Sequence, residues 1–572
     1  MNSLNKPIIY QLLPRLFGNQ NTSRIPNGTI KQNGCGKFYD INNQVLNQIK
    51  DLGATHVWYT GVIEHATKTD YSQFGITKCN PHVVKGNAGS PYAIRDYYDV
   101  DPDLAIDVNH RMEEFEQLIA RTHDAGLKVI LDFVPNHVAR EYASDKKPGG
   151  VEDIGQNDNK FSFFERDNNF YYITNQQFKP NIDLGEGSDE YVEFPAKATG
   201  NDCFNAFPSV NDWYETVKLN YGINYSNGSR SFFPIPSTWW KMLDILKFWA
   251  AKDIDGFRCD MAHMVPIEFW KWAIPQIKGL NPDIIFIAEI YEVGLYRQFI
   301  FEGQFDYLYD KVTLYDTLRG IICANVSAAS ITNCWQTVEG IQDHMLNFLE
   351  NHDEQRIASS QFALNPLKAL PAAVVSATIS RCPFMLYSGQ ELGEKAEDAE
   401  GFSGHDGRTT IFDYWSIPTI CRWLNGGKCN ESKLDNTEIK LRKSYKRLLN
   451  LCNTEKAICK GDFFDLMYVN YENLNPHRQY AYLRHFQNDA LLILVNFDSK
   501  EADVNINIPQ HAFDCCGLEM GEYEATDLMA DKPTKELILI SSISKIHFHL
   551  PDYGYKIIKL TRSNCINSNK KM

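Results

Sequence analysis

The sequence predicts an α/β fold: a (β/α)8 TIM barrel with an irregular insertion after its third strand and a C-terminal all-β domain. Short apolar runs of strand character alternate with helical patterns over the first three quarters of the 572 residues, as in βα units around a parallel sheet. Eight such runs can be drawn, which is the number of strands in this type of barrel. They cover residues 7–13, 54–60, 128–134, 254–260, 284–290, 305–309, 344–350 and 382–387.

Two helical segments show the pattern most clearly. Ser237 is predicted to be the N-cap of the helix before the fourth strand, and Gly126 is predicted to end the helix before the third. Apolar residues recur at helical spacing in both segments, which indicates packing against the strands and not a binding surface. The two stripes consist of Trp239, Met242, Leu243, Leu246, Trp249 and Ala250, and of Met112, Phe115, Leu118 and Ile119.

The alternation stops between His137 and about Tyr225, where Gly, Asn, Asp and aromatic residues dominate. A long insertion after a barrel strand is usually a small irregular domain over the mouth of the barrel, because the loops at the carboxyl ends of the strands build the site. The sequence therefore predicts a barrel of residues 1–137 and 226–452, with an insertion domain of residues 138–225.

Strands with period-two alternation follow a helix at about residues 438–452. Tyr480–Arg484 and Leu491–Asn496 flank a turn at Gln487–Asp489, and a last strand is predicted at Tyr555–Leu560. These strands predict a C-terminal β-sandwich over residues 453–562. The polar tail 563–572 is expected to be frayed.

Charge and composition exclude several classes of partner. The net charge of −15 and the absence of a basic stretch argue against nucleic acid and anionic membranes. Pro7 and Pro14 interrupt the first apolar run, and no run approaches the roughly 18–20 residues that cross a bilayer, so neither an export signal nor a membrane span is expected. The 14 cysteines show no ligand spacing, as is typical of apolar fillers in a reducing compartment. We expect a cytoplasmic protein.

Four short segments carry the chemistry. In each, an apolar run ends on polar residues, and the segments are DFVPNH (132–137), GFRCD (256–260), FIAE (286–289) and LENHD (349–353). They place Asp260, Glu289 and Asp353 at strand ends, where barrel enzymes carry their catalytic residues. Arg258, His137 and His352 lie beside these carboxylates.

Three carboxylates at strand ends suit the hydrolysis of an acetal between sugars. A glycosidase that retains the anomeric configuration needs an ionised carboxylate as nucleophile and a carboxylic acid opposite it, about 5 Å apart. Asp260 suits the first role, because Arg258 lies two residues earlier on the same strand face and would keep it ionised. Glu289 suits the second. Asp353, His352 and His137 would bind ring hydroxyls.

These segments resemble the four signature regions of the α-amylase superfamily of glycoside hydrolases (family 13-like). The similarity covers nearly the whole chain, from IIYQLLPRLFGN at the first strand through VKLNYG (217–222) to YSGQELG (387–393). The resemblance implies that Asp260, Glu289 and Asp353 are nucleophile, acid/base and transition-state stabiliser, and that Tyr92 is an aromatic platform under the sugar. It implies no redox or nucleotide cofactor.

Two positions concern features that vary within this family. Many α-amylases carry a Lys-His pair three and four residues after the nucleophile, where this sequence has His263 and Met264. His263 either binds the leaving-group sugar or packs in the core. Asn136 matches a position that often binds structural calcium, although one Asn does not define a cage of six to eight oxygens. No cofactor is therefore expected to be required, and calcium is a candidate ligand at Asn136.

The function that these residues predict is a retaining hydrolase of α-glucosidic linkages in α-glucans or maltooligosaccharides. Two alternatives remain open within the same ancestry, and a third, a structural scaffold, would be supported only if no glycan bound at all. One is a transglycosylase, in which a sugar replaces water in the second step. The other is a non-catalytic glucan-binding barrel, which would be expected to have lost a catalytic carboxylate.

Overall fold

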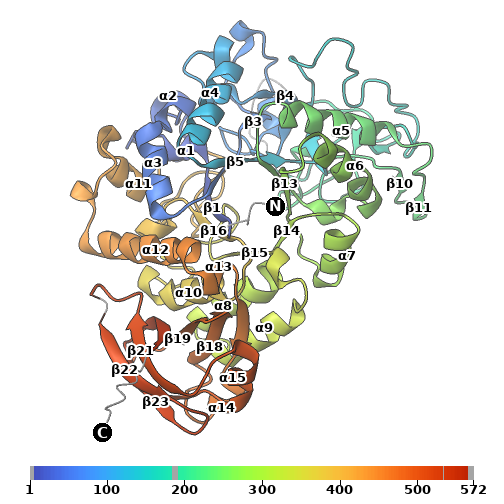
Figure 1. Ribbon diagram of the computed structural model, residues 1–572. Coiled ribbons are helices and arrows are strands. Elements are labelled where there is room, and N and C mark those ends of the chain that lie inside the picture. Colours follow the sequence, from blue (N-terminus) through green and yellow to red (C-terminus); the bar gives the residue numbers. More distant parts are fainter. Residues whose placement is uncertain (1–5, 183–190, 533, 564–572) are drawn as a thin grey trace, which may run out of the picture.

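The computed structural model describes residues 6–182, 191–532 and 534–563, and the greater part of the predicted tail, 564–572, lies outside them. Eight parallel strands close into a barrel in the order β1-β16-β15-β14-β13-β12-β5-β2 (Figure 1). The first strand pairs with both the second and the eighth, with Ile9 opposite His56 on one side and Met385 on the other. The predicted fold class is confirmed.

Each of the eight predicted runs contains one barrel strand. The strands are β1 (Ile8–Leu12), β2 (His56–Tyr59), β5 (Lys128–Phe133), β12 (Gly256–Cys259), β13 (Ile285–Ala288), β14 (Tyr307–Tyr309), β15 (Met345–Phe348) and β16 (Phe384–Tyr387).

Side-chain alternation divides the core into two layers. Inward-facing residues such as Ile9, Trp58 and Ile130 fill the barrel, whereas Ile8 and Tyr10 belong to the larger layer between strands and helices. The surrounding helices include α3 (Asn43–Leu52), α4 (Arg111–Asp124), α5 (Ser237–Ala250), α6 (Ile267–Leu280), α7 (Tyr296–Phe301), α8 (Asp316–Ile322), α9 (Ile331–Thr337), α10 (Leu370–Thr378) and α12 (Asn436–Thr454). Polar residues on the inward face of a strand therefore meet at the barrel mouth.

The predicted caps differ in detail. Ser237 is the first residue of α5 and not its N-cap, because the carbonyl of Pro236 already accepts a hydrogen bond from the Trp239 amide. Ala125 caps α4, and Gly126 follows it with φ +71° while its N–H donates to the carbonyl of His123. A left-handed residue after the last turn is a common helix end that glycine adopts without strain.

Between β5 and α5 the chain forms only short strands in its described part. The two that matter for the site are β6 (His137–Ala139) and β9 (Thr216–Lys218), which pair antiparallel so that His137 lies opposite Lys218. The others are β7 (Tyr172–Ile173), β8 (Ala196–Lys197), β10 (Ile223–Asn224) and β11 (Ser229–Arg230). A further pair, β3 (Ile63–His65) and β4 (Ile94–Val100), interrupts the connection from β2 to α4.

The C-terminal part packs below the barrel in Figure 1 and is mostly strand. A six-stranded sheet has the order β17-β18-β19-β24-β21-β22, and β20 pairs with β23. Its bounds are β17 (Asp462–Asp465), β18 (Gln479–Phe486), β19 (Asp489–Asn496), β20 (Ala502–Asn507), β21 (Gly521–Asp527), β22 (Lys535–Ile540), β23 (Lys545–Leu550) and β24 (Tyr555–Arg562). Short helices α13 (Lys456–Cys459), α14 (Met467–Asn470) and α15 (Gln510–Cys516), which were not predicted, accompany the strands.

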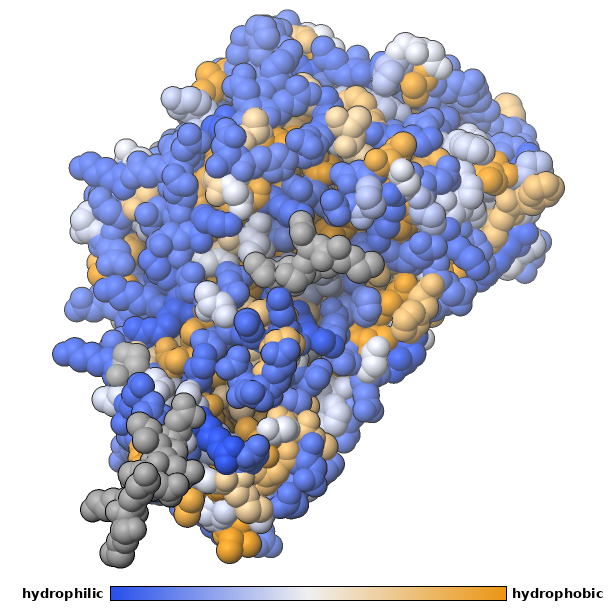
Figure 2. All heavy atoms as spheres, viewed as in Figure 1, coloured by the Kyte–Doolittle hydropathy of each residue, from blue (hydrophilic) through white to orange (hydrophobic). Residues whose placement is uncertain are grey.

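The face in Figure 2 is mostly hydrophilic, with apolar residues in small groups. Among the described residues no helix is both long and apolar enough to cross a membrane.

Candidate active site

Arg258 is the centre of the site. It lies on β12, is fully buried and faces the aromatic rings of Trp58 and Tyr309 inside the barrel. Its Nη1 donates to Asp260 Oδ1 at 2.7 Å, and its Nη2 lies 2.8 Å from Glu289 Oε1. Nη1 also contacts Asp132 Oδ1 at 3.4 Å. One guanidinium thus holds carboxylates from three adjacent strands, β5, β12 and β13.

Asp260 is placed by the end of β12, where its N–H donates to the carbonyl of Phe133 at 2.9 Å. The residue is 5% exposed. Burial raises the pKa of Asp260, and the charge of Glu289 raises it further, while Arg258 acts in the opposite direction. The site therefore contains a carboxyl whose ionisation depends on its cationic neighbour.

Glu289 has one ion-pair partner and two hydrogen-bond donors around its carboxylate. Besides Arg258, the Tyr291 hydroxyl donates to Oε1 at 2.5 Å and the Met261 N–H donates to Oε2 at 2.8 Å. Met261 can do this because its backbone is left-handed, with φ 44° and ψ 42°. This conformation is rare for a residue with a side chain, so the turn after Asp260 is a strained one that aims an N–H at Glu289.

Asp353 follows β15 and enters the same space from the opposite side. His352 Nε2 lies 3.0 Å from Asp353 Oδ2 and 2.5 Å from the Tyr92 hydroxyl, and the rings of Tyr92 and His352 are stacked at 5.2 Å. Burial acts to raise the pKa of Asp353, but His352 and Arg258 outweigh it and lower the pKa to about 2. Asp353 is therefore an anion across the working pH range of proteins.

His137 completes the ring of polar groups. Its Nε2 is 4.0 Å from Asp260 Oδ2, and its ring packs against Trp213 at 5.2 Å. Burial, together with the charges of Lys218 and Lys85, lowers the pKa of His137 to about 3. The imidazole is thus neutral, so one ring nitrogen donates and the other accepts a hydrogen bond.

These side chains surround a cavity of about 300 Å³. Of the predicted site residues, Tyr92, His137, Asp260, Glu289 and Asp353 line it, while Arg258 and His352 lie directly behind the wall. Other lining residues are Lys85, Ser90, Trp213, Glu215, Thr216, Met261, Tyr291, Ile411 and Phe412. A concave site with convergent carboxylates, an aromatic ring and a neutral His is suited to binding a sugar and transferring a proton.

The family model "Alpha amylase, catalytic domain" matches residues 11–413. The chain belongs to the α-amylase family. The predicted enzyme class, a glycosidase of α-amylase type, is confirmed by this match and by the names of the relatives below.

The relatives of this α-amylase-family protein are distant. "Alpha-amylase 3" of Dictyoglomus thermophilum is 23% identical over 438 residues, which cover 73% of this chain and 76% of that relative. A cyclomaltodextrinase of Thermoanaerobacter pseudethanolicus is 20% identical over 513 residues, covering 87% and 71%. The solved structure of the maltogenic α-amylase AmyB from Thermotoga neapolitana has a TM-score of 0.62 at 20% identity, covering 98% of this chain and all of the other.

Asn136 does not fit the calcium that members of the α-amylase family often hold at this position. Its Oδ1 accepts a hydrogen bond from the buried ammonium of Lys218, and its amide donates to the carbonyl of Gly200 at 2.8 Å. The same ammonium lies 2.7 Å from Asp202 Oδ1 and donates to the carbonyl of Met264 at 3.3 Å. These oxygens already surround a positive charge, and a divalent cation beside it would be repelled.

His263 is not among the residues that line the cavity. It lies in the 3₁₀ turn Ala262–Met264 that follows the left-handed Met261, and its ring packs edge-on against Tyr291 at 5.9 Å. The substrate contact predicted for His263 therefore stays a prediction. Its Nδ1 is buried and has no hydrogen-bond partner among the described residues.

Several contacts of the site were not predicted. Asp132 has a recognisable signal, since it follows inward-facing Ile130 by two residues and so lies on the same strand face. Tyr291 follows Glu289 by two residues but lies beyond the end of β13, so strand alternation does not predict its contact. The contact of Tyr309 could not be predicted from local sequence, because closure of the barrel brings its hydroxyl within 3.2 Å of Arg258 Nε. Gln11 on β1 reaches His352 Nδ1 at 2.7 Å past the one intervening strand, β16.

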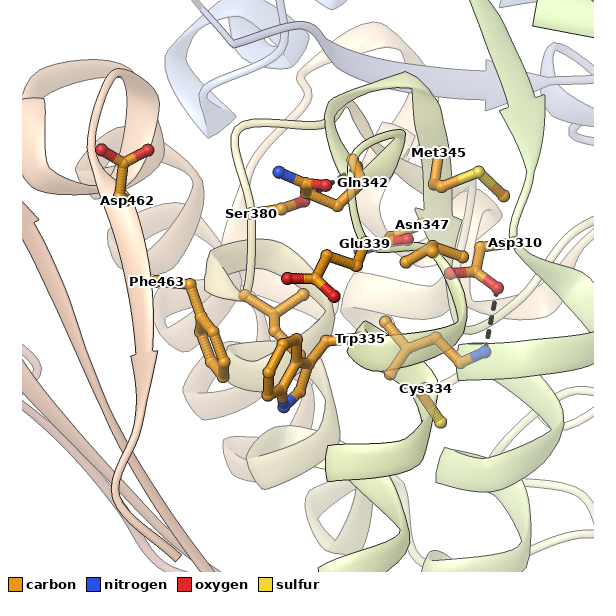
Figure 3. Close-up of a pocket in the computed structure, with 13 residues that line it drawn as sticks. Asp310, Cys334, Trp335, Glu339, Gln342, Met345, Asn347, Ser380, Asp462 and Phe463 are labelled. Atoms are coloured by element: carbon orange, nitrogen blue, oxygen red, sulfur yellow. Dashed lines mark hydrogen bonds between the residues drawn. The ribbon is translucent and has the colours of Figure 1, made fainter. Parts of the chain in front are cut away.

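A second cavity of about 180 Å³ lies between the barrel and the C-terminal sheet. Figure 3 shows Asp462 and Phe463 on the β17 side, facing Trp335, Glu339 and Gln342 from the barrel side. Asp310 in its wall already accepts a hydrogen bond from the Leu314 amide at 2.9 Å. No Arg or His is among the described residues that line this cavity, so it lacks the charge partners of the carboxylate cavity and is not a candidate active site.

Proposed function

We propose that this α-amylase-family enzyme hydrolyses α-glucosidic linkages of α-glucans or maltooligosaccharides with retention of configuration. The observation that carries the proposal is the shared guanidinium of Arg258, which contacts Asp260 at 2.7 Å and Glu289 at 2.8 Å. Two carboxylates on one guanidinium fork lie close together. This arrangement favours the separation of about 5–5.5 Å used for retention over the roughly 6.5–9.5 Å needed to fit a water for inversion.

In the first step, Asp260 attacks the anomeric carbon while the carboxylic acid of Glu289 gives its proton to the departing glycosidic oxygen. The products are a glycosyl ester on Asp260 and a shortened sugar. In the second step, Glu289 takes a proton from water, the water oxygen bonds to the anomeric carbon, and Asp260 is released. Tyr291 and Met261 hold Glu289 in place for both transfers.

Asp353 and His352 act on the sugar and not on the bond that breaks. Asp353 is an anion whose side chain is 41% exposed toward the cavity, so it can accept hydrogen bonds from ring hydroxyls. Such contacts accelerate the reaction if they strengthen as the ring flattens toward the oxocarbenium-like state. All three carboxylates are in place, which argues against a non-catalytic glucan-binding barrel.

Names of relatives support the same substrate class. Solved structures with this fold include an α-amylase of Geobacillus thermoleovorans complexed with acarbose and AmyP complexed with maltose, with TM-scores of 0.64 and 0.62.

Replacing Glu289 with Gln tests the assignment of acid and nucleophile together. We expect hydrolysis of maltotriose to fall by roughly 10²–10⁴-fold, the usual contribution of general acid catalysis. An α-glucosyl fluoride needs no proton to leave, so its first step should be nearly unchanged and the glycosyl ester on Asp260 should accumulate. Mass spectrometry of the peptide that contains Asp260 measures the ester, and proton NMR of the wild-type reaction reads the anomer first released. A β-anomeric product would refute retention.

We also infer that Lys218, and not calcium, joins the insertion to the barrel. Excess EDTA should leave both the melting temperature and kcat unchanged, because the ammonium supplies the positive charge between Asn136, Asp202 and the Met264 carbonyl. Lys218→Met should lower stability by about 1–3 kcal/mol, since it leaves a buried amide oxygen without a donor. Thermal melts with EDTA, with added calcium and with neither make the comparison. A melting temperature that falls in EDTA and returns with calcium would contradict the inference.

A further inference from the structure

Lys85 and Glu215 line the catalytic cavity, and the chemistry proposed above uses neither. Lys85 lies two residues after the 3₁₀ turn Pro81–Val83, and Glu215 immediately precedes β9. Their side chains form an ion pair with Nζ 3.0 Å from Oε2, and the residues are 8% and 4% exposed. A charged pair this deeply buried in a substrate cavity calls for a physical reason.

The hydrogen-bonding capacity of this pair is largely unfilled. An ammonium has three donors, yet within the described part of the chain Glu215 is the one polar group in contact with Lys85 Nζ. Its other neighbours are the rings of Tyr214 and Phe402, at 5.3 and 5.9 Å. Glu215 Oε2 accepts no hydrogen bond of good geometry among those residues. Buried charges are normally hydrogen-bonded as well as paired, so this pair is poised for a partner outside the chain.

From its neighbours we infer that the pair lies on the side of the cavity that would hold the glycone, the part of the substrate carrying the attacked carbon. Glu215 follows Trp213, whose ring packs on His137, and the loop of Lys85 leads into Tyr92. The Lys85 charge is also close enough to contribute to the lowered pKa of His137, after burial and Lys218. On the other side, Met261 and Tyr291 hold Glu289, where the leaving group departs.

The cavity volume of about 300 Å³ is at the lower end of the range for ligand sites, about 300–1,000 Å³. It suits one or two sugar rings and not a longer stretch of glucan. The terminal glucosyl residue at the non-reducing end differs chemically from every internal residue of an α-1,4-glucan. Its 4-hydroxyl is free, whereas the 4-oxygen of every internal residue is part of a glycosidic bond. Next to the 3-hydroxyl this makes a vicinal diol, which can accept from an ammonium and donate to a carboxylate at once.

We propose that Lys85 and Glu215 bind the free 3,4-diol of the non-reducing end, so that the enzyme removes short units from that end of maltooligosaccharides. This inference rests on the glycosidase function proposed above. The ion pair closes the glycone side of the cavity. Internal linkages of a long chain are therefore not cleaved, because the glucose residues on their glycone side would have to extend past the pair.

The decisive experiment compares two forms of maltoheptaose that carry the same fluorescent label at the reducing end. In one form the non-reducing end is free, and in the other its 4- and 6-hydroxyls are blocked as an ethylidene acetal. We expect kcat/KM for the blocked form to be at least 100-fold lower, and the free form to be shortened stepwise in chromatograms. Equal cleavage of both forms would overturn this inference and leave the hydrolase function standing. No cleavage of either form would overturn both.

Variants of Lys85 and Glu215 distinguish a role of the pair in substrate binding from a role in folding. Glu215→Gln and the doubly neutral variant Lys85→Met with Glu215→Gln should raise KM for the free form about 10–100-fold with little change in kcat, because the pair contacts a remote part of the sugar. The double variant contains no unpaired buried charge. It should therefore fold, so that its KM reports substrate binding. Lys252→Met is the matched control, since it breaks an outer pair with Glu116 at 2.6 Å. An unchanged KM in folded variants would refute the role of the pair.

Discussion

Asp260→Asn is expected to reduce kcat by roughly 10⁴-fold or more while the protein stays folded, because the amide cannot form the glycosyl ester although the sugar still binds. The amide oxygen can still accept the 2.7 Å hydrogen bond from Arg258 Nη1, so the site should keep its shape. The measurement is kcat on maltotriose for a variant whose thermal melt shows a folded protein. Retention of a tenth of wild-type activity would remove Asp260 from the nucleophile role.

The same variant should be at least as stable as the wild type at neutral pH. Burial and the Glu289 charge raise the pKa of Asp260 in the folded protein. A carboxyl with a raised pKa destabilises the fold increasingly as pH rises through the value of the unfolded chain toward the folded one. Asn carries no such penalty, so the advantage of the variant should disappear below about pH 4, near the unfolded pKa.

Asp132→Asn is the matched control. Asp132 contacts the same Arg258 nitrogen at 3.4 Å, and burial raises the pKa of Asp132 too. It does not line the catalytic cavity. We therefore expect its variant to share the stability effect and to keep far more activity than Asp260→Asn. Equal activity losses would indicate that both act only through Arg258.

Arg258→Met should give the largest loss of stability. It leaves Asp132, Asp260 and Glu289 buried without their shared cation, and breaking a buried ion pair in this way costs about 3–5 kcal/mol. The penalty requires ionised carboxylates, so it should be greatest at neutral pH and should shrink as pH falls below the unfolded carboxyl pKa of about 4. Thermal melts from pH 4 to 8 measure it. A deficit that does not vary with pH would point to lost packing instead.

Arg258→Lys distinguishes charge from geometry. The ammonium restores a cation, so part of the melting temperature should return. Catalytic activity should not return, because Lys lacks the planar fork that contacts two carboxylates with two nitrogens. Full activity in this variant would mean that charge alone positions Asp260 and Glu289.

The parts of the molecule that local sequence patterns encode could be predicted. All eight strands could be found because each is a short apolar run between turns, and Asp260, Glu289 and Asp353 because they end such runs. Ser237 was misplaced by one residue, since a cap depends on which carbonyl first accepts a helical hydrogen bond. Lys218 was visible in VKLNYG, but its role required the pairing of β6 with β9. Lys85 and Glu215 lie on segments without periodicity, whose meeting only the folded chain reveals.

The left-handed backbone at Met261 has a consequence for anyone who wants to make a more heat-resistant version of this enzyme. A side-chain-bearing residue in this conformation costs roughly 1–2 kcal/mol, so conventional stability design would replace Met261 with glycine. That exchange would also free the turn that keeps the Met261 N–H 2.8 Å from Glu289. The position is therefore one where greater thermal tolerance and catalytic precision call for different residues, and libraries built for stability should leave it unchanged.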